Sequence, residues 1–239
     1  MHWITRVREP SRLALAWQAP DGPYSDRKRR AVAEVVRGEG TELRFSYLTG
    51  TKDFEEAIKL GFEGYPAFKL SVKDHTQGVL PALMRRLPPR TRTDFEIYRE
   101  ALRIDPTVSV SDFALLAASE AKLPSDGFSL VDTFDDLRAP AQVLIDIAGY
   151  RHNDPNLTDR DVGAEVAFKP EPSNIHDPHA IIVILRGKKL GYVNTLQAKQ
   201  FYRVLRNYNV RAVIERLNGK PDKPRALLYV SIEHPVVGG

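Results

Sequence analysis

One short polar segment carries the side chains best suited to chemistry. Residues 169–183 read Lys-Pro-Glu-Pro-Ser-Asn-Ile-His-Asp-Pro-His-Ala-Ile-Ile-Val. The imidazoles of His176 and His179 and the carboxylate of Asp177 are groups that commonly bind metal ions. On a strand edge, however, side chains three residues apart point to opposite faces. We therefore expect no metal site in this segment.

Asp177 also has a purely structural interpretation. The pattern Asn-x-x-Asp-Pro, which begins at Asn174, is common in turns, because these side chains accept hydrogen bonds from nearby backbone amides. Asp177 can hold the turn, bind a ligand, or do both, and the sequence leaves these alternatives open.

Basic side chains gather in the second half of the chain. Residues 141–239 carry 14 Lys and Arg against 10 Asp and Glu, whereas residues 1–140 carry 21 of each. Between Arg186 and Arg225 there are 11 cations and only two carboxylates. Such a cluster attracts polyanions and supplies contacts to phosphate groups. It favours a nucleic-acid partner, with a solubilising surface as the alternative.

The sequence lacks the common catalytic and membrane-spanning patterns. It has no Walker loop, nucleophile elbow or kinase catalytic loop. The absence of cysteine excludes disulfides, thiolate metal sites and cysteine nucleophiles. No segment approaches the roughly 20 apolar residues that span a bilayer, and the first residues lack the pattern of a secretory signal. We expect a cytoplasmic protein that is not an enzyme, uses no cofactor and has no membrane partner.

The second half alternates short apolar segments with turns. Segments 142–148, 164–168, 180–185, 189–193, 210–216 and 226–232 predict strands. Between them, Asn194-Thr-Leu-Gln197 is a capping-box sequence that predicts the start of one helix. Helical spacing places Lys199, Arg203 and Arg206 on one side of that helix. Short strands with one main helix are typical of a small, OB-like β-barrel, closed or partly open.

The first half predicts a mixed α+β domain. Segments 12–17 and 43–48 read as strands, and segments 54–60, 93–102 and 111–121 have helical patterns. An acidic, turn-rich stretch ends near Arg138, where we place the domain boundary. The predicted domains are an α+β domain at 1–138 and a barrel at 139–239. Arginines around a proline-rich turn are expected to form a solvated rim, with further nucleic-acid contacts as the alternative: Arg85, Arg86, Arg90 and Arg92.

The motifs of the second half, in their order and spacing, resemble the HIRAN domain over about residues 142–232. The resemblance rests on Gly149-Tyr-Arg-His152, Lys169-Pro-Glu-Pro172, Asn174-Ile-His-Asp-Pro-His-Ala-Ile181 and Gly187-Lys-Lys-Leu-Gly-Tyr192. Ile175 and His176 stand where the family has Pro and Tyr. HIRAN domains are small β-barrels, and characterised members bind single-stranded DNA at its free 3′ end. The resemblance therefore implies a barrel that recognises such an end.

The resemblance also implies roles for five residues. Asp177 would bind the terminal 3′-OH, because a carboxylate repels phosphate but accepts a hydrogen bond from a hydroxyl. Arg151 would neutralise a backbone phosphate or stack on a base, and Lys169 would add a phosphate contact. His152 and His176 offer flat rings for stacking on bases. Without the resemblance, Arg151 and Lys169 would be read as solvated surface charges.

Further residues have less direct roles. Lys199 and Arg203 would extend the DNA contacts if their helix flanks the binding groove. Tyr192 and Phe201 are expected in the core, and Gly191 is expected to allow close packing of two backbones.

The first half resembles the N-terminal subdomain of HipA-type toxin kinases. The resemblance rests on the strand Leu43-Arg-Phe-Ser-Tyr-Leu48, on Gly61-Phe-Glu-Gly-Tyr-Pro66 and on Leu83-Met-Arg-Arg-Leu-Pro-Pro89. It implies another function, that of an antitoxin-like or accessory protein that regulates a HipA-like kinase. A generic α+β domain with these residues in its core is the alternative.

Overall fold

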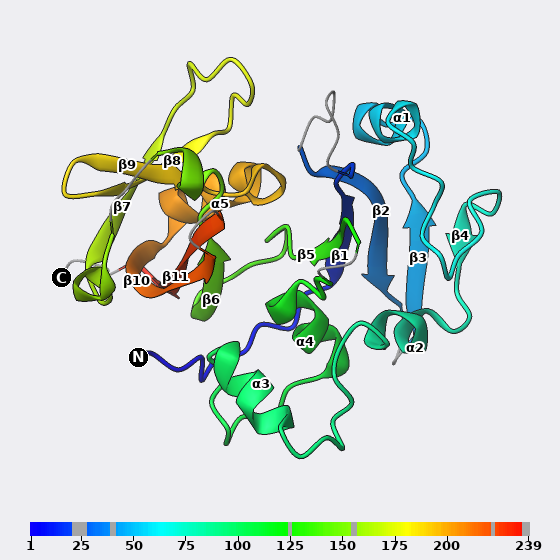
Figure 1. Cartoon of the computed structure of the whole chain (residues 1–239), viewed down its shortest axis with the longest axis horizontal. Helices are drawn as coiled ribbons and strands as arrows, with labels where there is room; N and C mark the ends of the chain where they lie inside the picture. Colours follow the sequence, from blue (N-terminus) through cyan, green and yellow to red (C-terminus); the bar gives the residue numbers. More distant parts are fainter. Residues whose placement is uncertain (21–27, 39–41, 124–125, 154–156, 221–222, 236–239) are drawn as a thin grey trace. The chain divides into compact units, whose positions relative to one another are not determined.

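The computed structural model describes residues 1–20, 28–38, 42–123, 126–153, 157–220 and 223–235. The chain divides into two compact units (Figure 1). The N-terminal unit comprises residues 9–98 and 110–133, and the C-terminal unit comprises residues 1–8, 99–109 and 134–239. The sequence predicts a boundary near residue 138 between two domains that fold independently. This boundary stays a prediction.

The N-terminal unit contains a five-stranded antiparallel sheet. Its strand order is β4 (Asp74–His75), β3 (Leu43–Tyr47), β2 (Arg30–Arg37), β1 (Arg12–Trp17) and β5 (Phe128–Val131). The first half of the chain also forms α1 (Lys52–Lys59), α2 (Val79–Met84), α3 (Phe95–Ala101) and α4 (Asp112–Ser119). The predicted α+β class is confirmed. Sequence patterns indicated β1 and β3 but missed β2, β4 and β5.

Arg86 corrects one expectation about the arginines of the first half. Its side chain is buried, and its guanidinium donates two hydrogen bonds of 2.8 Å to the carboxylate of Asp126. Nε donates a third hydrogen bond of 2.7 Å to the carbonyl oxygen of Ala121. The expectation of a solvated Arg86 was wrong, because partners 35 to 40 residues away satisfy its donors. Arg85, Arg90 and Arg92 are exposed, as expected.

The C-terminal unit contains a six-stranded antiparallel sheet. Its order is β6 (Ala141–Asp146), β11 (Lys223–Glu233), β10 (Asn209–Lys220), β7 (Glu165–Pro170), β8 (Ile181–Leu185) and β9 (Lys188–Tyr192). The sheet curls, and an antiparallel bridge joins Ala148, just after β6, to Tyr192 at the end of β9. The prediction of a barrel-like sheet with one main helix is confirmed.

The main helix, α5 (Thr195–Asn207), covers the inner face of the curled sheet (Figure 1). The side chain of Asn194 caps it by accepting a hydrogen bond of 3.0 Å from the amide of Leu196. Phe201, which is fully buried, packs edge-on against Phe168 of β7 with their ring centroids 4.9 Å apart. This confirms the core position expected of Phe201. The contact also shows that the face of β7 that carries Phe168 points to the core.

The first residues of the chain pack on the C-terminal unit. The amide and the imidazole Nδ1 of His2 both contact the buried carboxylate of Glu215, at 3.3 and 2.8 Å. Arg103 Nε donates a further hydrogen bond of 2.6 Å to Glu215. The side chain of Gln142 accepts a hydrogen bond of 2.8 Å from the amide of Thr5. No sequence pattern indicated these contacts between distant segments.

Candidate nucleic-acid interface

The outer face of the curled sheet carries one of the predicted contact residues. Strand pairing sets Lys169 of β7 opposite Ile182 of β8, and Ile182 opposite Tyr192 of β9. Residues paired across antiparallel strands point to the same side of a sheet, so these three side chains share a face. Phe168 and Val183, one position along, point to the core. Lys169 is exposed, about 10 Å from Tyr192 at the usual spacing of strands.

Tyr192 corrects a second expectation. The β8–β9 register shifts between Val183 and Ile184, so that Leu190 is an extra residue in β9. Such a bulge reverses the in–out alternation of every residue beyond it. Leu190 is therefore buried, whereas Tyr192 is half-buried on the outer face. The predicted core position of Tyr192 was wrong for this reason.

The hydroxyl of Tyr192 is the centre of a polar network. It donates a hydrogen bond of 2.9 Å to Glu171 Oε2 and accepts one of 2.5 Å from Lys189 Nζ. Asn174 Nδ2 donates to the same Glu171 oxygen at 2.5 Å and to the Tyr192 hydroxyl at 3.3 Å. The hydrogen bonds from Asn174 and Tyr192 hold the pKa of Glu171 below its usual value. The network ties the segment after β7 to the end of β9.

Asn174 also orders the turn that carries His176 and Asp177. Its Oδ1 accepts hydrogen bonds from the amides of His176 at 3.0 Å and of Asp177 at 3.1 Å. Asp177 Oδ1 in turn accepts one of 2.8 Å from the amide of His179. Asp177 thus holds the turn with one oxygen, and Oδ2 has no hydrogen bond to the part of the chain that the structure describes. The His176 side chain is exposed.

Arg151 and His152 lie in a short 3-10 helix, η1 (Tyr150–His152), which follows Gly149 in the left-handed conformation. The buried ring of Tyr150 anchors this helix in the core. His152 is exposed, and Arg151 Nε donates a hydrogen bond of 3.0 Å to His152 Nε2. Because η1 begins two residues after the bridge between Ala148 and Tyr192, it lies beside the end of β9.

The close approach of these backbones depends on Gly191. A Cβ atom at this position would lie 2.4 Å from the carbonyl oxygen of Ala148 and 2.6 Å from Ile147 Cγ2. The φ angle of Gly191, +153°, is also one that other residues rarely adopt. The expectation that Gly191 serves backbone packing is confirmed.

Five of the seven predicted contact residues therefore lie on segments that are connected to Tyr192 or to its part of the sheet. Its backbone contacts the segment that leads to Arg151 and His152, its hydroxyl contacts the turn of His176 and Asp177, and Lys169 lies two strands away. Glu171, Asn174 and Tyr192, which position this cluster, were not predicted as site residues. The Asn-x-x-Asp-Pro pattern was the signal available for Asn174, and nothing in the sequence marked the bulge.

Lys199 and Arg203 lie elsewhere in the C-terminal unit. Both are exposed on α5, and Arg203 donates a hydrogen bond of 2.9 Å to Gln200. The opposite side of α5, with Ala198 and Phe201, packs on the inner face of the sheet. Lys199 and Arg203 thus lie on α5 and not on the outer face of the sheet that carries Lys169 and Tyr192.

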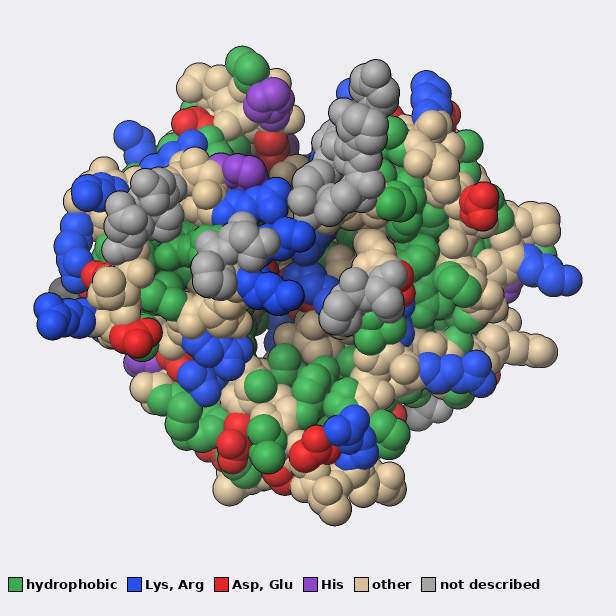
Figure 2. Space-filling model, in the orientation of Figure 1, with side chains coloured by type: hydrophobic (Ala, Val, Ile, Leu, Met, Phe, Trp, Pro, Cys, Tyr) green, Lys and Arg blue, Asp and Glu red, His purple; other side chains and the backbone are tan. Residues whose placement is uncertain are grey.

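The charge distribution agrees with an anionic ligand. On the visible face of the C-terminal unit, Lys and Arg side chains are more abundant than Asp and Glu (Figure 2). Within the described residues no group of three or more metal-binding side chains occurs. No helix among the residues that the structure describes is long and apolar enough to cross a membrane.

Comparisons with known proteins concern about two-fifths of the chain. No curated protein matches it by sequence. One similar structure is the crystal structure of the HIRAN domain of human HLTF, with 17% identity, 38% of this chain and 74% of that chain covered, and a TM-score of 0.32. Another is a Lactobacillus plantarum protein, with 22% identity, 40% of this chain and all of that chain covered, and a TM-score of 0.31.

The family match places the boundaries of the domain close to those expected from the motifs. It begins one residue after the predicted start at 142 and ends three residues beyond the predicted end at 232. It does not extend to the first half, so the resemblance to HipA-type kinases and the kinase partner stay predictions. Residues 143–235 match the family model of the HIRAN domain, and this part of the chain is a HIRAN domain.

Proposed function

We propose that the C-terminal unit binds single-stranded DNA at a free 3′-OH end and catalyses no reaction. HIRAN domains are known to bind DNA ends, which supports a DNA partner for this one. The single observation that carries the proposal is the arrangement around Tyr192. Two cations, two imidazoles and one carboxylate lie on three separate segments of the chain, and these segments are linked through Tyr192 and the strands beside it.

The cations and rings suit a single strand. The guanidinium of Arg151 and the ammonium of Lys169 neutralise backbone phosphates, and their contribution weakens as salt concentration rises. The exposed rings of His152 and His176 offer surfaces for stacking on unpaired bases, a contact that tolerates any sequence. We therefore expect the DNA sequence to have little effect on binding.

Asp177 provides the preference for an end. Inside a DNA strand, each 3′ oxygen belongs to a phosphodiester, whose charge a carboxylate repels. At the terminus that oxygen is a hydroxyl, which donates a hydrogen bond to a carboxylate. Because Asp177 Oδ1 is held by the amide of His179, Oδ2 is the oxygen that would accept from the 3′-OH.

The proposal is tested by fluorescence anisotropy at one stated salt concentration. One labelled oligonucleotide is compared as a single strand with a 3′-OH, as a single strand with a 3′-phosphate, and as a blunt duplex. We expect tightest binding to the 3′-OH strand. Equal binding to both single strands would remove the end preference but keep DNA binding, and no binding to any of them would overturn the proposal.

A further inference from the structure

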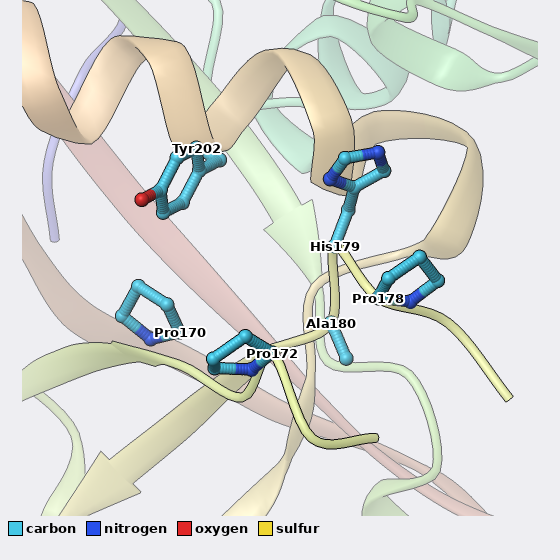
Figure 3. A pocket seen from close by; sticks show the side chains of 6 residues that line it. All are labelled: Pro170, Pro172, Pro178, His179, Ala180 and Tyr202. Atoms are coloured by element: carbon cyan, nitrogen blue, oxygen red, sulfur yellow. The ribbon is translucent and has the colours of Figure 1, made fainter. Parts of the chain in front are cut away.

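A pocket lies at the end of β7, beside the segment that connects β7 to β8. Its volume is about 230 Å³. It opens between that segment and α5 (Figure 3). Three proline rings, an imidazole, a methyl group and a phenol line it: Pro170, Pro172, Pro178, His179, Ala180 and Tyr202.

The shape of the pocket favours a flat, mostly apolar ligand. Tyr202 projects from α5 over Pro170 and Pro172, and the His179 ring enters from the opposite end (Figure 3). The volume lies below the roughly 300–1,000 Å³ typical of pockets for drug-sized molecules. A single ring system fits such a space better than a large cofactor. The Tyr202 hydroxyl has no hydrogen-bond partner among the described residues, so it is available to a polar ring edge.

The charges around the pocket favour an anionic group attached to that ring. Lys199 and Arg206 stand three residues before and four residues after Tyr202, which places them beside it on α5. The guanidinium carbon of Arg206 lies 5.9 Å from the centroid of the Tyr202 ring. No carboxylate lines the pocket. A planar ring joined to a phosphate, as in a nucleotide, combines both properties.

The pocket and the turn of Asp177 belong to one continuous piece of structure. Pro178 and His179 line the pocket and follow Asp177 directly in the sequence. The amide of His179 donates to the Asp177 carboxylate over 2.8 Å. A nucleotide bound at Asp177 would therefore lie within one or two residues of the rim of the pocket.

We propose that this pocket binds one unpaired nucleobase, from one of the last two nucleotides of the DNA strand. Tyr202 and the proline rings would enclose the base, and Lys199 and Arg206 would contact the adjoining phosphate. The inference rests on the proposed function, and it adds a second binding site beside the turn that carries Asp177. It would also give Lys199 a role in DNA binding.

The test combines damaged DNA with pocket variants of the full chain. The probes are labelled single strands of about 12 nucleotides with a 3′-OH, within the site size of one OB-like fold. Each carries a single abasic site at one of the four 3′-terminal positions. For the natural protein, we expect an abasic site at one of the last two positions to weaken binding about tenfold. This is the effect of losing one stacked base.

The variants then identify which side chains contact the missing base. His179→Ala and Tyr202→Ala should each weaken binding to intact DNA and should lose the penalty at that one abasic position. Tyr202→Phe keeps the ring and should behave like the natural protein. Because Tyr202 also packs against the core, Tyr202→Ala is interpreted only if its melting temperature is unchanged. The exposed side chain of His179 provides an independent variant with no such packing role.

Two outcomes would overturn the inference in distinguishable ways. If the penalty at each abasic position is the same in the natural protein and in His179→Ala, no base occupies the pocket. The proposed function survives that result if the preference for a 3′-OH persists. If the natural protein binds no DNA at all, both proposals fail together.

Discussion

Ala148 and Tyr192 exchange two backbone hydrogen bonds, each of 2.8 Å. Through this pair the end of β9 is held against the residues that follow β6, at opposite edges of the six-stranded sheet. The backbone pair that joins the two edges of the sheet therefore also holds the segment of Arg151 beside β9. Arg151 follows Ala148 by three residues, and the Tyr192 side chain reaches the turn of Asp177 through Asn174.

Replacing Gly191 with alanine should disrupt this closure. The added Cβ would lie 2.4 Å from the carbonyl oxygen of Ala148, and the backbone conformation is itself unfavourable for alanine. We expect a loss of about 3 kcal/mol in the free energy of unfolding, measured by chemical denaturation. Gly163→Ala is the matched control, because its φ is also positive but its Cβ would meet nothing within 4 Å. Equal losses in both variants would contradict the proposed role of close packing.

Replacing Asn174 with alanine should weaken DNA binding more than it weakens the fold. The change removes the acceptor for the amides of His176 and Asp177 and the donor to Glu171. We expect a stability loss of about 1–2 kcal/mol and at least a tenfold loss of affinity, since the turn would no longer be held for its ligand. Anisotropy and thermal denaturation measure the two effects. Ser173→Ala, an exposed neighbour, is the control, and unchanged affinity in Asn174→Ala would count against an ordered turn as the binding element.

Replacing Arg151 with alanine should change how binding depends on salt. For a single strand, each phosphate that a cation neutralises adds about 0.7 to the steepness with which log affinity falls against log salt concentration. Without the Arg151 guanidinium we therefore expect a flatter slope and weaker binding at low salt. Arg160→Ala removes an exposed arginine from another part of the same unit and should leave the slope unchanged. An unaltered slope in Arg151→Ala would place Arg151 outside the phosphate-binding residues.

Glu215 should make the stability of the C-terminal unit sensitive to acid. Burial alone would raise its pKa, but hydrogen bonds from His2 and Arg103 outweigh burial and hold the pKa below the ordinary value of 4.5. A lowered pKa means that the charged form stabilises the fold above about pH 4.5, and that this contribution is lost as the pH falls through the lowered pKa.

The matching variant is Glu215→Gln, with Glu165→Gln as an exposed control. We expect Glu215→Gln to lose roughly 3 kcal/mol of stability at neutral pH, because Arg103 keeps no anionic partner there. Its melting temperature should also fall less on acidification than that of the natural protein. Parallel pH profiles for the natural protein and Glu215→Gln would refute this account.

The sequence predicts the fold of the second half well because its signals are local. A continuous run of apolar, mostly β-branched residues marks β8, and the Asn194 cap marks the start of α5. The strands β2, β4 and β5 of the first half were missed. β5 has only four residues, Phe128-Ser-Leu-Val131, with a single β-branched side chain, so its sequence carries a weak strand signal.

The candidate site was harder to predict, because its geometry depends on tertiary contacts. Arg151, His152, Lys169, His176 and Asp177 were identified from motifs, whereas Tyr192 was assigned to the core. A single bulged residue, Leu190, reverses the side on which Tyr192 emerges, and no local pattern announces it. Arg86 illustrates the same limit, since its partner Asp126 is 40 residues away.

The most direct test of the account compares 3′-OH and 3′-phosphate strands for the natural protein and for Asp177→Asn, by anisotropy at fixed salt. Asparagine keeps an oxygen that can accept from the His179 amide, so the turn is retained while the charge is removed. We predict that the natural protein prefers the 3′-OH strand and that Asp177→Asn binds both strands equally. The same preference in both proteins, or equal weakening on both strands, would show that Asp177 only holds the turn and would contradict end recognition by its carboxylate.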